Sequence, residues 1–165
     1  MNLVTAYIAL GANLKDPEAQ VKAGFEALAM LPKTRLAAMS SLYRSEPVGY
    51  VEQPDFVNAV AKVETALEPL ELLDALLEIE RSHGRVRDFP NAPRTLDLDL
   101  ILYDERAHDE EGLEIPHPRM HERAFVLVPL AELASDAIVP GHGRVRDLLP
   151  GVDVESVTKI ESADG

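Results

Sequence analysis

The chain has 165 residues, of which 46% are hydrophobic and 27% charged, so we expect one globular domain over residues 1–165. It contains no run of 18 apolar residues and no N-terminal leader pattern, which excludes a membrane span and a signal peptide. The formal net charge of -13 argues against a nucleic-acid binder, and the absence of cysteine removes disulfides and cysteine-type zinc sites and agrees with a cytoplasmic location.

Apolar periodicity and turn residues predict the secondary structure in chain order. Asp16 and Pro17 have the residue types of an N-cap and a first helical position, and Gly84 that of a helix stop. The predicted elements are a strand at 3–11, a helix at 16–31, a strand at 34–45, a loop at 46–54, a strand at 56–65, a helix at 68–84, an irregular loop at 85–93, a strand at 94–103, an acidic surface turn at 104–112, and a turn with a helix at 116–134.

The order βαββαβ predicts an α+β fold of the ferredoxin-like type, with C-terminal additions. In that fold a mostly antiparallel sheet is covered by helices on one face. The last 15 residues show weak periodicity, so we expect the tail after about residue 150 to be frayed.

The strand at 94–103 carries two aspartates in an otherwise apolar run, RTLDLDLILY. Because side chains alternate along a strand, Asp97 and Asp99 project from one face, roughly 6.6 Å apart along the backbone. Asp is a poor strand former, and the two charges repel. One interpretation is a solvated strand face. The other is a cation site, because Mg²⁺ takes one or two protein carboxylates together with substrate phosphates.

Arginines gather around this strand although the protein is acidic overall. The planar arginine fork suits bidentate contacts to phosphate. A glycine-rich phosphate loop of the GxxxxGK[ST] type is absent from the sequence. The aspartate pair and the arginines together indicate phosphoryl or pyrophosphoryl transfer from a nucleotide. All the Lys and Arg residues between positions 81 and 123 are arginines, namely Arg81, Arg85, Arg87, Arg94, Arg106, Arg119 and Arg123.

Six motifs in this order resemble the 6-hydroxymethyl-7,8-dihydropterin pyrophosphokinase family: YIALGANL, SSLYRSEPVG, QPDFVNAVAKVET, GRVR, APRTLDLDLILYD and IPHPRMHERAFVLVPL. The resemblance covers nearly all of residues 3–140. It implies that ATP gives its β,γ-pyrophosphoryl group to the hydroxymethyl oxygen of the dihydropterin in folate biosynthesis, and that AMP leaves. It also implies two Mg²⁺ ions held by Asp97 and Asp99, and a monomer without nucleic-acid or membrane partners.

The resemblance also implies roles for further residues by their position. Arg85 and Arg94 join the two aspartates in catalysis, with Arg85 and Arg87 on a mobile loop. The residues implied in nucleotide binding are Glu80, Arg87, Leu100, His117 and Arg123. Those implied in pterin binding are Ser45, Glu46, Val48, Phe56, Asn58 and Phe125. Asn58 can both donate and accept at an amide-like edge, and phenylalanine rings suit a flat heterocycle.

Several of these residues have a plainer interpretation. Glu80 can be a solvated helix glutamate, Arg119 a surface residue, and an isolated Phe is usually part of a core. His117 and His121 are four residues apart, but without a third ligand they indicate zinc only weakly, and Mg²⁺ prefers oxygen. We therefore expect a hydrogen-bonding His117 and a surface His121.

The loop at 85–93 departs from the family pattern. Many relatives have Arg-Trp shortly before this strand, whereas this chain reads FPNAPRTLDLD and contains no tryptophan. We therefore expect the adenine contacts to differ from those in these relatives. We expect the loop to close over bound ATP and to exclude water from the transferred group.

Three other functions compete with this prediction. A regulatory module that only binds a nucleotide does not need Asp97 and Asp99 together. A metal phosphodiesterase normally shows more His and Asp ligands than the five scattered histidines of this chain. A structural or interaction protein explains the acidic composition but not the arginine cluster.

Overall fold

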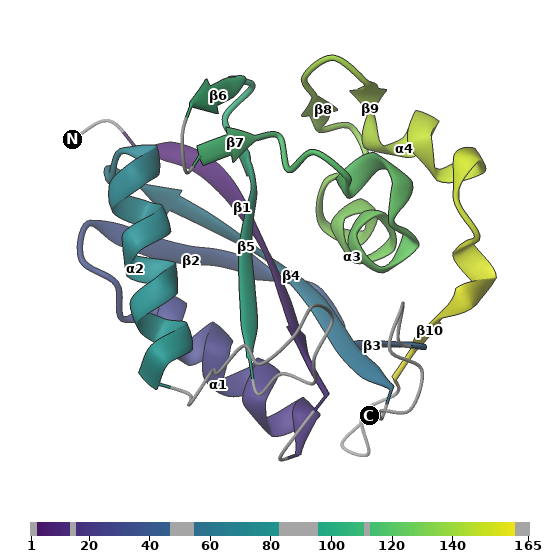
Figure 1. Ribbon diagram of the computed structural model, residues 1–165, viewed down its shortest axis with the longest axis horizontal. Coiled ribbons are helices and arrows are strands. Elements are labelled where there is room, and N and C mark those ends of the chain that lie inside the picture. Colours follow the sequence, from purple (N-terminus) through teal and green to yellow (C-terminus); the bar gives the residue numbers. More distant parts are fainter. Residues whose placement is uncertain (1–2, 14–15, 47–54, 83–95, 111–112, 161–165) are drawn as a thin grey trace.

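The computed structural model describes residues 3–13, 16–46, 55–82, 96–110 and 113–160. One antiparallel sheet runs through the molecule, with helices on both of its faces (Figure 1). Its described strands are β1 (Val4–Ala12), β2 (Thr34–Met39), β3 (Tyr43–Ser45), β4 (Phe56–Thr65), β5 (Asp97–Tyr103) and β10 (Val157–Lys159). The helices are α1 (Pro17–Ala29), α2 (Pro69–Ser82), α3 (Ala124–Ala134) and α4 (Val145–Leu148), with single turns η1 (Met120–Glu122), η2 (Leu149–Gly151) and η3 (Val154–Ser156). Two small hairpins complete the fold: β6 (His108–Glu110) with β7 (Leu113–Ile115), and β8 (Ile138–Val139) with β9 (Gly143–Arg144).

The sheet has the order β10-β3-β4-β1-β5, and β2 also pairs with β4. β1 therefore lies between β4 and β5, and it is antiparallel to both. Its register places Gly11 opposite Asn58 of β4 on one side and opposite Asp97 of β5 on the other. Residues that pair across strands share a face of the sheet, so these three residues point in the same direction.

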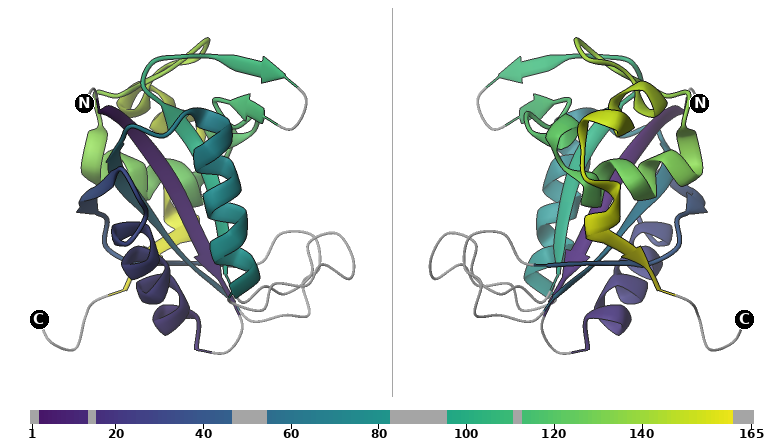
Figure 2. Two further views of the ribbon diagram at one scale, coloured as in Figure 1. Left: turned by 90° about the vertical axis from the view of Figure 1, so that its left-hand side faces the viewer. Right: turned by 90° about the vertical axis from the view of Figure 1, so that its right-hand side faces the viewer.

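The two faces of the sheet bury separate cores. Ile8 and Leu10 of β1 pack with the apolar sides of α1 and α2, whereas Tyr7 packs with α3. A register shift between Tyr7 and Ile8 places both Ile101 and Leu102 of β5 in the α3-side core. The expectation of helices on one face is therefore wrong, because α3 covers the face opposite to α1 and α2 (Figure 2).

Most predicted elements agree with the structure to within a few residues, and the α+β class with a mostly antiparallel sheet is confirmed. The closer match to the ferredoxin-like type stays a prediction. Asp16 caps α1 as expected, since its carboxylate accepts a hydrogen bond from the Ala19 amide at 3.4 Å. The irregular loop predicted at 85–93, the Gly84 stop and most of the loop at 46–54 lie outside the described residues.

Three expectations need correction. The strand predicted at 34–45 is two strands, because the Ser40 hydroxyl accepts the Val60 amide at 2.8 Å and interrupts the ladder. The acidic segment at 104–112 includes strand β6 as well as a turn. The C-terminal segment does not fray throughout. It passes along α3, and its strand β10 then pairs with β3 (Figure 1, Figure 2).

Each helix in the described part of the chain is too short or too polar to span a membrane.

The α1/α2 core yields a stability prediction. Leu76 of α2 is 0% exposed, whereas Leu70 of the same helix is 47% exposed. We expect Leu76→Ala to lower the free energy of unfolding by about 2–5 kcal/mol, because the truncated side chain leaves a cavity. The same substitution at Leu70 should change it by about 0.5 kcal/mol or less. Urea unfolding measures the free energy of unfolding of both variants. Equal losses of stability in the two variants would contradict the assignment of Leu76 to the core.

Candidate active site

A cavity of about 630 Å³ lies on the α3 side of the sheet. Its floor consists of the small β1 residues Ala9 and Gly11, flanked by Asn58 on β4 and by Asp97 and Asp99 on β5. A Cβ added at Gly11 would lie 3.5 Å from the Asn58 Oδ1 atom, an ordinary van der Waals contact, so Gly11 directly adjoins the Asn58 amide. The sheet register thus brings a polar amide and two carboxylates to one surface, although they are about 40 residues apart in sequence.

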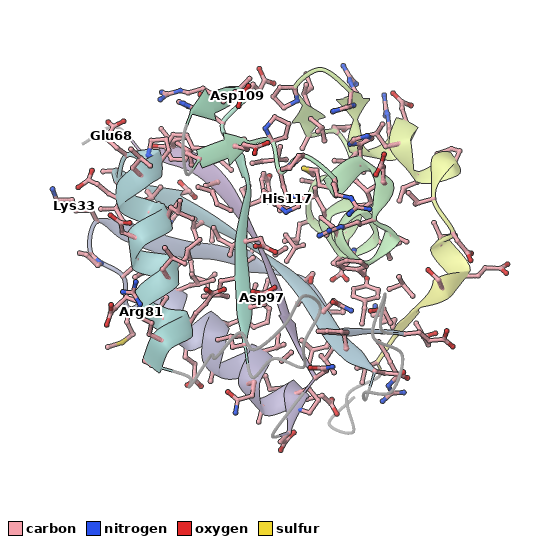
Figure 3. All side chains as sticks on the ribbon, viewed as in Figure 1. Lys33, Glu68, Arg81, Asp97, Asp109 and His117 are labelled. Atoms are coloured by element: carbon pink, nitrogen blue, oxygen red, sulfur yellow. The ribbon has the colours of Figure 1, made fainter. Side chains whose placement is uncertain are left out.

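The cavity combines the carboxylates with cationic side chains. Asp97 lies on β5, and His117, Arg119 and Arg123 line the same cavity from the segment that leads into α3. Figure 3 shows Asp97 and His117 projecting between β5 and α3. Burial lowers the pKa of His117, Arg123 and Arg119 lower it further, and the Asp97 carboxylate opposes them. His117 is therefore predominantly neutral at pH 7, and an anion bound beside it would favour its protonated form.

The cavity also contains aromatic and amide groups. Phe56 of β4 and Phe125 of α3 are half-buried and both line the cavity. The Asn58 amide nitrogen donates to the Ser45 hydroxyl at 2.7 Å, which fixes the orientation of the amide. The Arg123 guanidinium lies 5.6 Å from the centre of the Phe125 ring, within the range of a cation–π contact. A flat, polar-edged ring fits between such groups.

Glu132 on α3 holds β3 against α3. Its carboxylate accepts hydrogen bonds from the Ser41 amide, at 3.1 and 3.0 Å to its two oxygens, and from the Ser41 hydroxyl at 3.1 Å. The buried Tyr43 hydroxyl also donates to it, and burial followed by this hydrogen bond raises the Tyr43 pKa. Because β3 carries Ser45 and α3 carries Phe125, this cluster connects two walls of the cavity.

The C-terminal segment adds a further wall. β10 pairs with β3 so that Val157 lies opposite Ser45, and the preceding residues Asp153 and Ser156 line the cavity. The Asp153 carboxylate accepts a hydrogen bond from the Glu155 amide at 3.2 Å, and the Ser156 hydroxyl donates to the Asp153 carbonyl at 2.6 Å. No sequence signal marks these two residues, because the weak periodicity of the segment predicts only a frayed tail.

Most of the predicted site residues that lie in the described part of the chain meet in this cavity: Ser45, Glu46, Phe56, Asn58, Asp97, Asp99, His117, Arg123 and Phe125. Val48, Arg85, Arg87 and Arg94 lie outside the described residues. The sequence analysis missed Ala9, Gly11, Glu122, Asp153 and Ser156, which also line the cavity. The small residues of YIALGAN alternate in a way that marks Ala9 and Gly11 as one face of a strand, but only the register shows which strands flank them.

Leu100 and Glu80 do not line the cavity. The Leu100 side chain is 5% exposed and packs in the α1/α2 core. Glu80 is 3% exposed, so the interpretation as a solvated helix glutamate is wrong.

Two residues with a predicted surface position differ from that prediction in part. Arg119 is largely exposed and yet lines the cavity. His121 is half-buried and its ring stacks on that of His142, with centroids 3.8 Å apart, so it lies only partly at the surface.

The donor set of the cavity fits Mg²⁺ better than zinc. In the described part of the chain, no group of three or more His, Cys, Asp or Glu side chains could hold a metal ion. Asp97 and Asp99 supply two carboxylates to one cavity. Mg²⁺ is characteristically bound in this way, by one or two carboxylates with substrate oxygens and water completing its shell.

Comparison with known proteins agrees with the resemblance seen in the motifs. Residues 7–135 match the family model described as 7,8-dihydro-6-hydroxymethylpterin-pyrophosphokinase (HPPK). The chain is 48% identical over 157 residues to the 2-amino-4-hydroxy-6-hydroxymethyldihydropteridine pyrophosphokinase of Pseudomonas aeruginosa, which covers 95% of this chain and 97% of that protein. It is 50% identical over 147 residues to the protein of that name from Haemophilus influenzae, which covers 89% of this chain and 92% of that protein.

Solved structures support the fold. A crystal structure of Plasmodium falciparum HPPK-DHPS with pterin and p-hydroxybenzoate superimposes with a TM-score of 0.72 over 97% of this chain, at 14% identity. This chain spans 48% of that longer protein.

The surroundings of His117 give a prediction about pH. We expect its NMR titration midpoint to lie below the ordinary value of 6.5, because burial and Arg123 disfavour the imidazolium. The unfolded chain then binds more protons than the folded chain, so stability falls as the pH drops from 6.5 through the folded-state pKa. Arg123→Gln should raise the midpoint, and Asp97→Asn should lower it. A midpoint above 6.5 in the ligand-free protein would contradict this environment.

Proposed function

This chain belongs to the 7,8-dihydro-6-hydroxymethylpterin-pyrophosphokinase family, and we propose that ATP is its pyrophosphoryl donor and that the cavity between β5 and α3 is its active site. The reaction is the transfer of a pyrophosphoryl group to hydroxymethyldihydropterin, a step of folate biosynthesis. The observation that carries the assignment is the register of β1, which places Asn58 and Asp97 on either side of Gly11.

The pterin lies beside the aromatic side chains of the cavity. Phe56 and Phe125 pack against the faces of the ring, and Asn58 forms hydrogen bonds with its amide-like edge. Ser45 accepts from the Asn58 amide nitrogen, so the Oδ1 atom is oriented before the substrate binds. Backbone groups of Ser45 and Glu46, and of Val48 outside the described residues, complete the edge contacts. The hydroxymethyl group then lies toward Asp97 and Asp99.

The triphosphate lies beside the cationic side chains of the cavity. Arg123, Arg119 and His117 line the cavity and neutralise phosphate oxygens, and the imidazole of His117 can take up a proton as the anion binds. Three further arginines contact the same triphosphate in this proposal. They are Arg85, Arg87 and Arg94, which lie outside the described residues. Positioning and charge neutralisation of this kind provide most of the rate in phosphoryl transfer.

Asp97 and Asp99 would hold two Mg²⁺ ions, as the resemblance implies. When bound, the metal neutralises phosphate charge and lowers the pKa of the acceptor hydroxyl. In the transfer, the hydroxymethyl oxygen attacks the β-phosphorus and its proton is released to the solvent. The bond from that phosphorus to the bridging oxygen of the α-phosphate breaks, and AMP leaves with that oxygen. Closure of the loop at 85–93 excludes water, so that the pterin rather than water accepts the group.

We also propose that the protein acts as a cytoplasmic monomer with small-molecule partners only. The absence of cysteine is compatible with a reducing compartment. Analytical ultracentrifugation of the purified protein tests the monomer directly.

The metal-site prediction concerns Asp97 and Asp99. We expect Asp97→Asn or Asp99→Asn to lower the rate of AMP formation from ATP and hydroxymethyldihydropterin by at least about 10²–10³-fold, because each removes a carboxylate from the site where charge is neutralised. Asp109→Asn is the matched control, since Asp109 lies on β6 at the far end of β5 from Asp97 (Figure 3). Formation of ADP in place of AMP by the wild-type protein would refute the proposed reaction.

The pterin-site prediction separates the two substrates. We expect Asn58→Ala to weaken pterin binding by about 10- to 100-fold, because a buried hydrogen-bonding group is lost. Binding of an ATP analogue should change by about twofold or less. Lys62→Ala, four residues along β4 and outside the cavity, is the control for effects of the strand itself. Calorimetric titration measures both affinities, and equal losses for the two ligands would remove Asn58 from the pterin site.

A further inference from the structure

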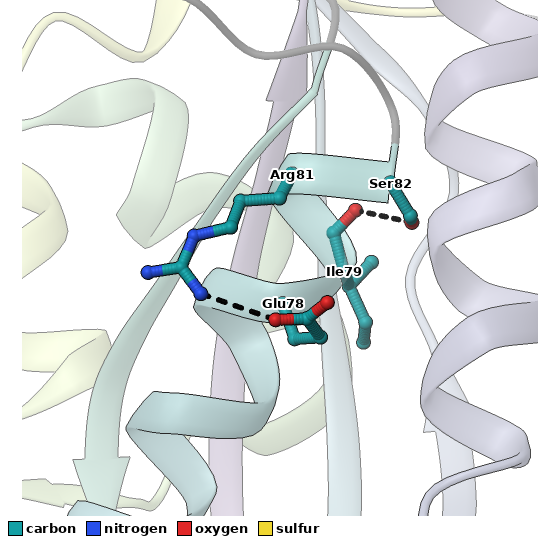
Figure 4. A network of polar contacts seen from close by, with 4 residues as sticks. All are labelled: Glu78, Ile79, Arg81 and Ser82. Carbon is teal, nitrogen blue, oxygen red and sulfur yellow. Dashed lines mark hydrogen bonds and ion pairs between the residues drawn. The ribbon is translucent and has the colours of Figure 1, made fainter.

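Glu80, near the end of α2, is a carboxylate buried to 3% exposure. Burying a carboxylate costs free energy unless hydrogen bonds replace its contacts with water. Its neighbours in the helix differ: the Glu78 and Arg81 side chains are 74% and 70% exposed and form an ion pair at 3.1 Å. Figure 4 shows this pair and the Ser82 hydroxyl, which donates to the Ile79 carbonyl at 2.7 Å. Glu80 alone of the three charged residues in this turn points inward.

The inward carboxylate meets the backbone of β5. The Glu80 Oε2 atom accepts a hydrogen bond from the Leu98 amide at 2.7 Å. Leu98 is the residue between Asp97 and Asp99, and its own side chain is 4% exposed in the α1/α2 core. Hydrogen bonds to an ionised acceptor are shorter and stronger than those between neutral groups.

The position of β5 in the sheet explains why this contact matters. In the described strand order, β5 lies at the edge of the sheet and has β1 on its inner side. Amides alternate in direction along an antiparallel strand. Since the Leu98 amide points to Glu80, the amides of Asp97 and Asp99 point toward β1, where these residues pair with Gly11 and Ala9. The segment is thus held from both sides, by β1 and by α2.

We propose that Glu80 is a positioning residue: through the Leu98 amide it fixes the backbone between Asp97 and Asp99, and so sets the geometry with which the two carboxylates bind Mg²⁺. This inference rests on the proposed metal site. It differs from the role in nucleotide binding that the family resemblance implies for Glu80. The side chain acts on the strand, and the cavity lining in the described part of the chain does not include it.

The two roles predict different ligand dependence. Substitution of a residue that contacts the base or ribose weakens the binding of ATP but not that of tripolyphosphate, which lacks both groups. Substitution of a residue that positions Asp97 and Asp99 weakens the binding of magnesium tripolyphosphate and of ATP alike. We therefore expect Glu80→Ala to weaken the binding of both, measured by calorimetry in the presence of Mg²⁺, by about 10- to 100-fold. Glu80→Gln retains an oxygen acceptor and should restore binding to within a few-fold of wild type.

Amide hydrogen exchange gives a readout that does not depend on the metal. We expect the Leu98 amide to exchange at least about tenfold faster in Glu80→Ala than in wild type without any ligand, while the core amides of β4 change only with global stability. Glu78→Ala is the matched control, because it removes an exposed carboxylate from the same turn and should change neither exchange nor binding. If Glu80→Ala does not fold, Glu80→Asp, which keeps the charge but is one methylene shorter, carries the same test.

Two results would overturn the inference. Loss of ATP affinity with unchanged tripolyphosphate affinity would make Glu80 a nucleoside contact. Unchanged Leu98 exchange and unchanged binding of both ligands would leave it a buried structural group. Failure of the metal site itself is recognised separately, because Asp97→Asn would then bind magnesium tripolyphosphate as tightly as wild type.

Discussion

The antiparallel register of β1 with its two neighbours is the constraint on which the candidate site depends. Gly11 lies between Asn58 and Asp97, and Ala9 lies between Val60 and Asp99. A shift of one residue in either pairing would turn Asn58 or the aspartates to the other face of the sheet, into the core formed by α1 and α2. Burial of Ile8, Leu10, Leu98 and Leu100 on that face disfavours such a shift, so the apolar core fixes the polar surface opposite to it.

The position of α3 decides what that polar surface becomes. A sheet face without a helix would be a solvated surface, and the aspartates would need no further explanation. α3 packs on Tyr7, Val60 and Ile101 beyond the site and leaves a cavity over the small residues Ala9 and Gly11. Glu132 connects α3 with β3, and β10 connects the C-terminal segment with β3. Three segments distant in sequence thereby enclose one site.

The lining of the cavity combines charged and aromatic side chains. Asp97, Asp99, His117 and Arg123 supply both signs of charge, and Phe56 and Phe125 supply aromatic surface beside the oriented Asn58 amide. The Arg123 guanidinium lies 5.6 Å from the centre of the Phe125 ring, so the two kinds of group adjoin. Although the protein is acidic overall, cationic side chains are therefore placed locally at this cavity.

Local patterns in the sequence determined most of the elements: the β1 strand, the Asp16 N-cap of α1 and the span of β4 follow from alternation, capping and composition. They also singled out Asp97 and Asp99 as candidate site residues on one strand. The family resemblance added seven further residues that line the cavity: Ser45, Glu46, Phe56, Asn58, His117, Arg123 and Phe125. The tertiary structure alone decided that α3 covers the face opposite to α1 and α2, that Asp153 and Ser156 reach the cavity, and that Glu80 is buried against β5 while Leu100 is core. These facts depend on which distant segments pair and pack, and contacts between residues far apart in sequence leave no trace in the local periodicity of a single chain.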